Sequence, residues 1–82
     1  MSKTVLIVDD DPTQRRLMQA VCEKAGYFVM QADDGQKAVD ILRSPEGQAV
    51  SLVMLDLIMP NLGGMETLDQ IRGFREDLPV VM

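Results

Sequence analysis

The hydrophobic positions fall into short runs that predict strands, separated by segments in which apolar residues repeat at helical spacing. Three predicted strands are Val5–Val8, Tyr27–Met30 and Ser51–Leu55, and a fourth begins at Pro79 and ends with Met82. A run that is apolar throughout indicates a strand buried on both faces, which is typical of a parallel sheet. The sequence therefore predicts a sheet of parallel strands.

One helix is predicted between each pair of successive strands. The first extends from Pro12 to about Ala25, with Asp11 as its N-cap and Gly26 at its end. The second follows an acidic turn and is succeeded by a polar loop over residues 44–47, and a longer loop over residues 57–64 precedes the third. Apolar spacing marks the second helix at Ala38, Ile41 and Leu42, and the third at Met65, Leu68 and Ile71, which we expect to face the core.

Helices that alternate with parallel strands imply an α/β doubly wound sheet with right-handed crossovers. At 82 residues the chain has room for a single domain, which we assign to residues 1–82. The sequence stops inside its last predicted strand, with no helix after it. We expect that this is a cut within the domain.

Composition excludes several classes of function. The chain has no histidine, which excludes a Ser-His-Asp triad, a histidine-ligated zinc and a phosphohistidine carried on this chain. The net charge is −5, and the only adjacent basic pair is Arg15-Arg16, so we expect no nucleic-acid contact by this segment. No apolar run is long enough for a membrane span or a signal peptide. With one cysteine, Cys22, the sequence predicts a soluble, cytoplasmic protein.

Two of the predicted strands are followed directly by acidic residues. Asp9 and Asp10 follow the first, and Asp56 follows the third. If these strands are neighbours, the three carboxylates meet at the carboxyl edge of the sheet, where ligands of open α/β sheets bind. Carboxylates so close repel and raise one another's pKa, and a bound divalent cation such as Mg²⁺ would offset this repulsion. Helix capping is the simpler interpretation for other acids, namely Asp11, Asp33 and Asp34.

These residues resemble the receiver domain of two-component response regulators. Four blocks carry the resemblance: Val5-Leu6-Ile7-Val8-Asp9-Asp10-Asp11-Pro12, Ala32-Asp33-Asp34-Gly35-Gln36-Lys37-Ala38, Leu55-Asp56-Leu57-Ile58-Met59-Pro60 with Gly64, and Leu78-Pro79-Val80-Val81. They occur in order over Lys3 to Met82, and the order makes the signal strong.

The resemblance implies a flavodoxin-like fold with strand order 2-1-3-4(-5). It implies that Asp56 accepts a phosphoryl group from a sensor histidine kinase or a phosphotransfer protein. Asp10, Asp56 and the backbone carbonyl of Ile58 would ligate Mg²⁺, and Asp9 would act through water or the second shell. Such a domain catalyses only its own phosphorylation and dephosphorylation. The opening resembles receivers of transcription activators, which implies a role in transcription regulation.

The resemblance also implies elements that this sequence does not contain. Beyond Met82 would lie the family's Ser/Thr at the end of strand four, its lysine after strand five, the last strand and the last two helices. Without the helices, one sheet face and one strand edge would be open, and open apolar edges recruit other chains. We therefore expect a homodimer, a swapped assembly or marginal stability for the 82-residue chain.

The alternative interpretation is that the chain is a phosphatase. Residues 9–13 fit the pattern D-x-D-x-T of haloacid-dehalogenase-type phosphatases, in which Asp9 would be the nucleophile and Asp11 the general acid. That family also needs a Ser/Thr at the next strand end, a lysine and a later acidic pair. The segments Met30-Gln31 and 56–60 do not supply them. The two readings differ in whether Asp56 or Asp9 is essential.

Overall fold

The computed structural model describes residues 3–56 and 62–82. The elements alternate between strand and helix, as the sequence predicts. In chain order they are β1 (Thr4–Val8), α1 (Pro12–Lys24), β2 (Phe28–Ala32), α2 (Gly35–Arg43), a short 3-10 helix η1 (Glu46–Ala49), β3 (Val50–Leu55), α3 (Gly64–Phe74) and β4 (Val80–Val81).

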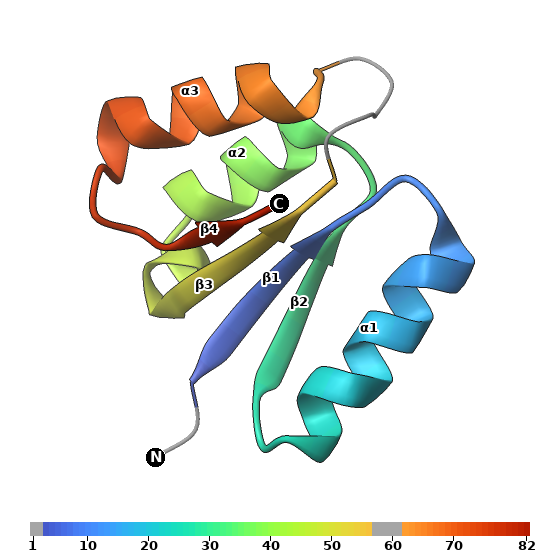
Figure 1. Ribbon diagram of the computed structural model, residues 1–82. Coiled ribbons are helices and arrows are strands. Elements are labelled where there is room, and N and C mark those ends of the chain that lie inside the picture. The colour runs from blue at the N-terminus through green and yellow to red at the C-terminus, as the bar shows by residue number, and fades with distance from the viewer. Residues whose placement is uncertain (1–2, 57–61) are drawn as a thin grey trace.

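All four strands run parallel in the order β2-β1-β3-β4, which confirms the predicted sheet. Figure 1 shows α2 and α3 together on one face of the sheet and α1 alone on the other. Side chains of β1 alternate between the two faces. Leu6 and Val8 join the core beneath α2 and α3, whereas Val5 and Ile7 pack with Cys22 of α1. Because helices cover both faces, β1 must be apolar throughout, and its last four residues are buried.

The ends of the helices explain several polar residues. The Asp11 carboxylate caps α1 and the Asp34 carboxylate caps α2, as predicted. Gly26 follows α1 with φ +96°, a conformation that favours glycine. Gly35 lies where α2 meets α3, and a Cβ there would be 1.9 Å from Oγ1 of the buried Thr67. Glycine at this position therefore lets the two helices approach.

Several local predictions are wrong. The second strand is Phe28–Ala32 and not Tyr27–Met30, because its pairing with β1 runs from Phe28 to Ala32. The polar loop after α2 leads into η1, and Met65 is exposed although we expected it in the core. On α3 the buried residues are Gly64, Thr67 and Ile71.

Arg72 stabilises the end of α3. Its guanidinium donates hydrogen bonds to the backbone carbonyls of Arg75 and Leu78. It therefore supports the turn that leads from α3 into β4.

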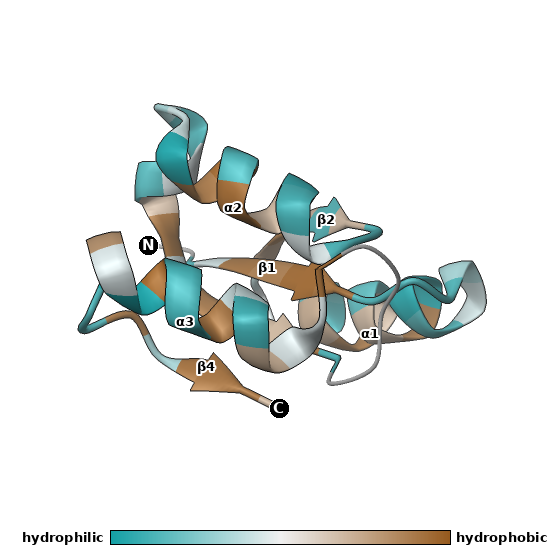
Figure 2. Cartoon of the chain, turned by 90° about the horizontal axis from the view of Figure 1, so that it is seen from above, coloured by the Kyte–Doolittle hydropathy of each residue, from teal (hydrophilic) through white to brown (hydrophobic). Residues whose placement is uncertain are grey.

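The α1 face leaves an apolar surface uncovered. Leu17 and Val21 of α1 and Val81 and Met82 at the end of the chain are exposed. Met18 and Met54 lie between them, in contact with two adjoining hollows. Figure 2 shows that β4 and most of β1 are hydrophobic, whereas the helices alternate hydrophilic and hydrophobic segments. Across residues 3–56 and 62–82, no helix is long and apolar enough to cross a bilayer.

Candidate metal centre

The candidate site forms where β1 and β3 end side by side. Their pairing places Val8 opposite Leu55, so the next residues, Asp9 and Asp56, leave the sheet at the same point. The Asp56 N–H donates a hydrogen bond of 2.9 Å to the Val8 carbonyl. This bond continues the ladder past the strand and holds the Asp56 backbone against β1.

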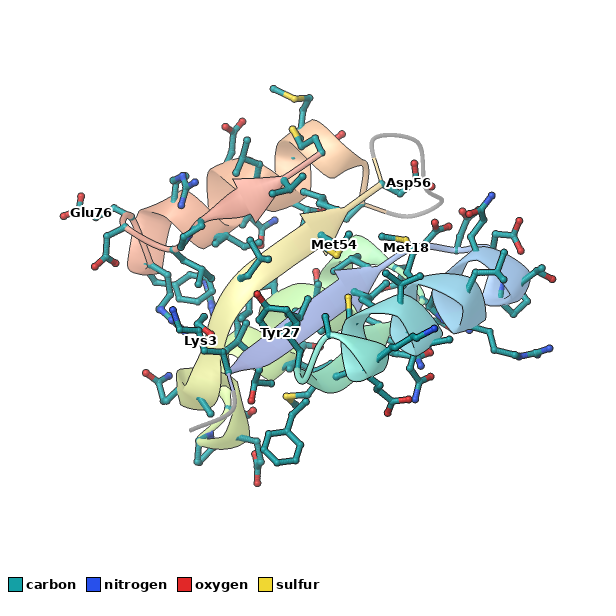
Figure 3. All side chains as sticks on the ribbon, turned by 60° about the horizontal axis from the view of Figure 1, so that its bottom comes forward. Lys3, Met18, Tyr27, Met54, Asp56 and Glu76 are labelled. Carbon is teal, nitrogen blue, oxygen red and sulfur yellow. The ribbon has the colours of Figure 1, made fainter. Side chains whose placement is uncertain are left out.

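Three carboxylates meet at this edge. One oxygen each from Asp9, Asp10 and Asp56 lies within 4.8 Å of the other two. Asp9 and Asp56 are half-buried, and Asp10 is exposed. Figure 3 shows Asp56 at the carboxyl end of β3, beyond Met54 on the same strand. The structure thus brings together the three acids that the sequence predicts to converge.

Asp9 is held from both its backbone and its side chain. Its N–H donates to the Ala32 carbonyl at 3.1 Å, and its Oδ1 accepts the Asp11 N–H at 2.9 Å. Partial burial raises the pKa of Asp9, the hydrogen bond from Asp11 opposes this, and the charges of Asp56, Asp10 and Asp11 raise the pKa further. Ionised Asp9 is therefore disfavoured by its surroundings, and a bound cation would remove that penalty.

The donor set fits Mg²⁺. Mg²⁺ is a hard cation that takes oxygen ligands, commonly one or two carboxylates together with several waters. The three clustered carboxylates offer those oxygens, and the exposure of Asp10 leaves the site open to water. Ile58, whose backbone carbonyl is a predicted ligand, lies outside the described residues.

The carboxylates of Asp11 and Asp33 have partners of their own. The Asp11 carboxylate accepts the N–H groups of Thr13 and Gln14, at 2.9 and 3.4 Å. The Asp33 carboxylate forms an ion pair with Lys37 at 2.8 Å, and the hydrogen bond from Lys37 lowers the pKa of Asp33. Asp11 therefore caps its own helix, as the capping interpretation predicts.

A hollow of about 250 Å³ adjoins the carboxylates. Asp9 and Asp56 line one part of it, and the rest is apolar, with side chains from α1, β3 and the end of the chain. In Figure 3, Met18 and Met54 lie beside one another on this side of the sheet. The site therefore combines an acidic rim with an apolar wall.

Arg15 contacts the site, although the sequence marked it only as half of a basic pair. Its Nη1 donates a hydrogen bond of 2.7 Å to the Asp9 carbonyl. The signal that could have found it is spacing, because Arg15 lies one helical turn after the N-cap Asp11 and so points back toward the acidic loop.

Comparison with known proteins gives one consistent result. The family model of the response regulator receiver domain matches residues 5–82. Response regulator MprA of Mycobacterium tuberculosis is 38% identical over 82 residues, which are 100% of this chain and 34% of that protein. The alkaline phosphatase synthesis transcriptional regulatory protein PhoP of Bacillus subtilis is 35% identical over 82 residues, 100% of this chain and 33% of that protein. The chain thus spans about a third of the length of these relatives.

Solved structures agree with this result. TrrA of Thermotoga maritima, in complex with Mg²⁺-BeF, superposes with a TM-score of 0.83 at 32% identity, over 95% of this chain and 65% of that one. TrrA in complex with the histidine kinase ThkA gives a TM-score of 0.86 at 32% identity, again over 95% of this chain and 65% of the matched one.

Proposed function

The chain belongs to the family of response regulator receiver domains, and from that membership we propose that Asp56 is its phosphoryl acceptor. The observation that carries the proposal is the convergence of Asp9, Asp10 and Asp56 within 4.8 Å at the carboxyl edge of the sheet. Asp56 follows a central strand, where an acceptor meets both a cation and an incoming phosphoryl group. We take residues 1–82 as one receiver segment.

The reaction we infer transfers a phosphoryl group from a phosphohistidine. A carboxylate oxygen of Asp56 forms the new O–P bond while the N–P bond breaks, and the electron pair of that bond stays on the imidazole nitrogen. Such transfers have loose transition states, so positioning and charge supply most of the catalysis. The bond between the Asp56 N–H and Val8 fixes the nucleophile against the sheet. The chain would act only on its own phosphorylation and dephosphorylation.

The metal ligands we propose are those that membership of the receiver family implies. We propose that Asp10, Asp56 and the Ile58 carbonyl ligate Mg²⁺ directly, and that Asp9 acts through water or from the second shell. Asp10 is exposed, whereas one oxygen of Asp9 already accepts the Asp11 N–H. When bound, Mg²⁺ would supply positive charge to the phosphoryl oxygens.

The partner we propose is a sensor histidine kinase or a phosphotransfer protein. TrrA, a structural neighbour, has been solved in complex with the histidine kinase ThkA. The relative PhoP is a transcriptional regulatory protein, which supports a role in transcription regulation for the longer protein. A cytoplasmic location stays a prediction, supported by the buried free thiol of Cys22.

A phosphorylation assay tests the proposal. The chain is incubated with Mg²⁺ and a small acyl-phosphate donor, and the attached phosphoryl group is located by mass spectrometry. We expect labelling at Asp56 that Asp56→Asn abolishes, whereas Asp69→Asn, on the exposed face of α3, leaves it intact. Labelling that survives Asp56→Asn but disappears in Asp9→Asn would instead support the phosphatase reading.

A further inference from the structure

Arg15 links three elements at the entrance to the acidic cluster. It lies in the first turns of α1, is partly buried, and donates through Nη1 to the Asp9 carbonyl at 2.7 Å. Its Nε donates to Oε1 of Gln31, on β2, at 3.3 Å. One guanidinium therefore joins the start of α1, the end of β1 and the edge strand β2.

The Gln31 side chain is itself anchored. Its Nε2 donates to Oε1 of Gln19, one turn after Arg15 on α1. Gln19 in turn donates to Glu23 at 3.3 Å. The chain of hydrogen bonds runs along α1 and fixes the direction of the Arg15 side chain.

The Asp9 carbonyl belongs to the peptide that leads into Asp10. Neighbouring backbone groups are held by the sheet, because the Val8 carbonyl accepts the Asp56 N–H and the Asp9 N–H donates to Ala32. The Asp9 carbonyl lies past the ladder, and Arg15 holds it. We propose that Arg15 is a positioning residue, which fixes the Asp9–Asp10 peptide so that the Asp10 carboxylate meets Asp56 at the metal site. This inference rests on the proposed function.

The role proposed for Arg15 depends on the geometry of its guanidinium. Nη1 donates to the Asp9 carbonyl while Nε donates to the Gln31 side chain. A planar guanidinium can donate to two acceptors at once, whereas an ammonium at the end of a lysine cannot reproduce that fork.

The test measures Mg²⁺ affinity, with no phosphorylation step. Mg²⁺ is titrated into the 82-residue chain while the backbone amide resonances of residues 10 and 56 are followed by NMR. Arg15→Met removes the contacts, Arg15→Lys keeps the charge, and Arg16→Met removes a neighbouring charge that is exposed and makes no hydrogen bond or ion pair among the described residues. Gln31→Leu removes the second contact of Arg15 together with the Gln31–Gln19 bond, and it leaves the contact of Arg15 with the Asp9 carbonyl in place.

We expect Arg15→Met to raise the Mg²⁺ Kd about tenfold, the size typical for residues that orient metal ligands. Arg15→Lys should remain impaired, Gln31→Leu should raise the Kd less, and Arg16→Met should leave it close to wild type. If Arg15→Met does not fold, the Mg²⁺ Kd values of Gln31→Leu and Arg16→Met are compared, and a higher Kd for Gln31→Leu supports the proposal.

The proposal is overturned if Arg15→Met and Arg16→Met weaken binding equally, if Arg15→Lys restores it fully, or if no Arg15 or Gln31 variant changes it. Wild-type chain that binds no Mg²⁺ would overturn the metal site as well. Wild-type binding that Asp10→Asn abolishes but Arg15→Met leaves unchanged would overturn the role of Arg15 alone.

Discussion

Replacing Asp9 by asparagine should make the metal-free chain more stable and weaken its response to Mg²⁺. The substitution keeps the side-chain oxygen that accepts the Asp11 N–H, so the local turn is preserved. It removes a negative charge that faces Asp10 and Asp56. The pKa of Asp9 is already raised by partial burial and by these neighbours, which shows that the folded chain disfavours its ionised form.

The size of the effect follows from the spacing of the carboxylates. Two like charges 4.8 Å apart repel by about 0.9 kcal/mol in a medium as polar as water, and by about 3.5 kcal/mol at an effective dielectric constant near 20. Asp10 is exposed and the hollow opens to solvent, so the lower value governs each pair. With two such pairs, Asp9→Asn should gain about 1–2 kcal/mol of unfolding free energy at low salt.

Urea unfolding at neutral pH, with chelator or with Mg²⁺, measures both effects. Asp69→Asn is the matched control, because it makes the same change in net charge at an exposed site without a hydrogen bond or ion pair among the described residues. Added Mg²⁺ should stabilise wild type and Asp69→Asn more than Asp9→Asn, since only a ligand bound to the folded state raises its stability. An equal gain from Asp69→Asn, or equal stabilisation of all three by Mg²⁺, would refute the reasoning.

Three further predictions concern the fold. Gly35→Ala should lower the free energy of unfolding by about 2 kcal/mol or more, because the new Cβ would collide with the Thr67 side chain of α3. Gly73→Ala, whose Cβ would have no atom within 4 Å, should raise the free energy of unfolding by about 0.5–1 kcal/mol, and equal effects in urea unfolding would contradict this. Lys37→Met should raise the lowered pKa of Asp33 toward its usual value, and NMR titration measures this; an unchanged pKa would contradict the prediction. The stability that this ion pair contributes is present above the usual Asp pKa and is lost as the pH falls through the lowered pKa of Asp33. Sedimentation should show that the chain self-associates and that Val81→Lys, at the rim of the apolar hollow, reduces this; a compact wild-type monomer would disprove it.

The site could be predicted because its signal is local. A buried strand that ends abruptly in acid is visible in the sequence, and β1 and β3 both show it at Asp9 and Asp56. The sheet order adds only that these strands are neighbours. The capping roles of Asp11 and Asp34 were predictable for the same reason, since a cap contacts only the next few residues.

The predictions were wrong or incomplete where contacts between residues distant in the sequence determine the structure. The pairing with β1 moves the second strand to Phe28–Ala32, although Tyr27 begins the hydrophobic run in the sequence. On α3 the buried face includes Gly64 and Thr67, which do not stand out as hydrophobic, so the apolar spacing in the sequence points to Met65 instead. The contact of Arg15 with the Asp9 carbonyl depends on how α1 leaves the sheet, and composition or periodicity cannot show it.

The parallel pairing of β1 with β3 has a consequence for when the site exists. The paired residues Thr4 and Val50 are separated by more than half of the chain, and the sequence between β1 and β3 forms α1, the edge strand β2, α2 and η1. Closing so long a loop is slow and entropically costly compared with forming a local turn. During synthesis, Asp9 and Asp10 leave the ribosome before Asp56, because they lie much earlier in the chain. The three carboxylates cannot converge on the nascent chain until β3 has docked against β1. The convergence of the three carboxylates thus reports that the central sheet has folded.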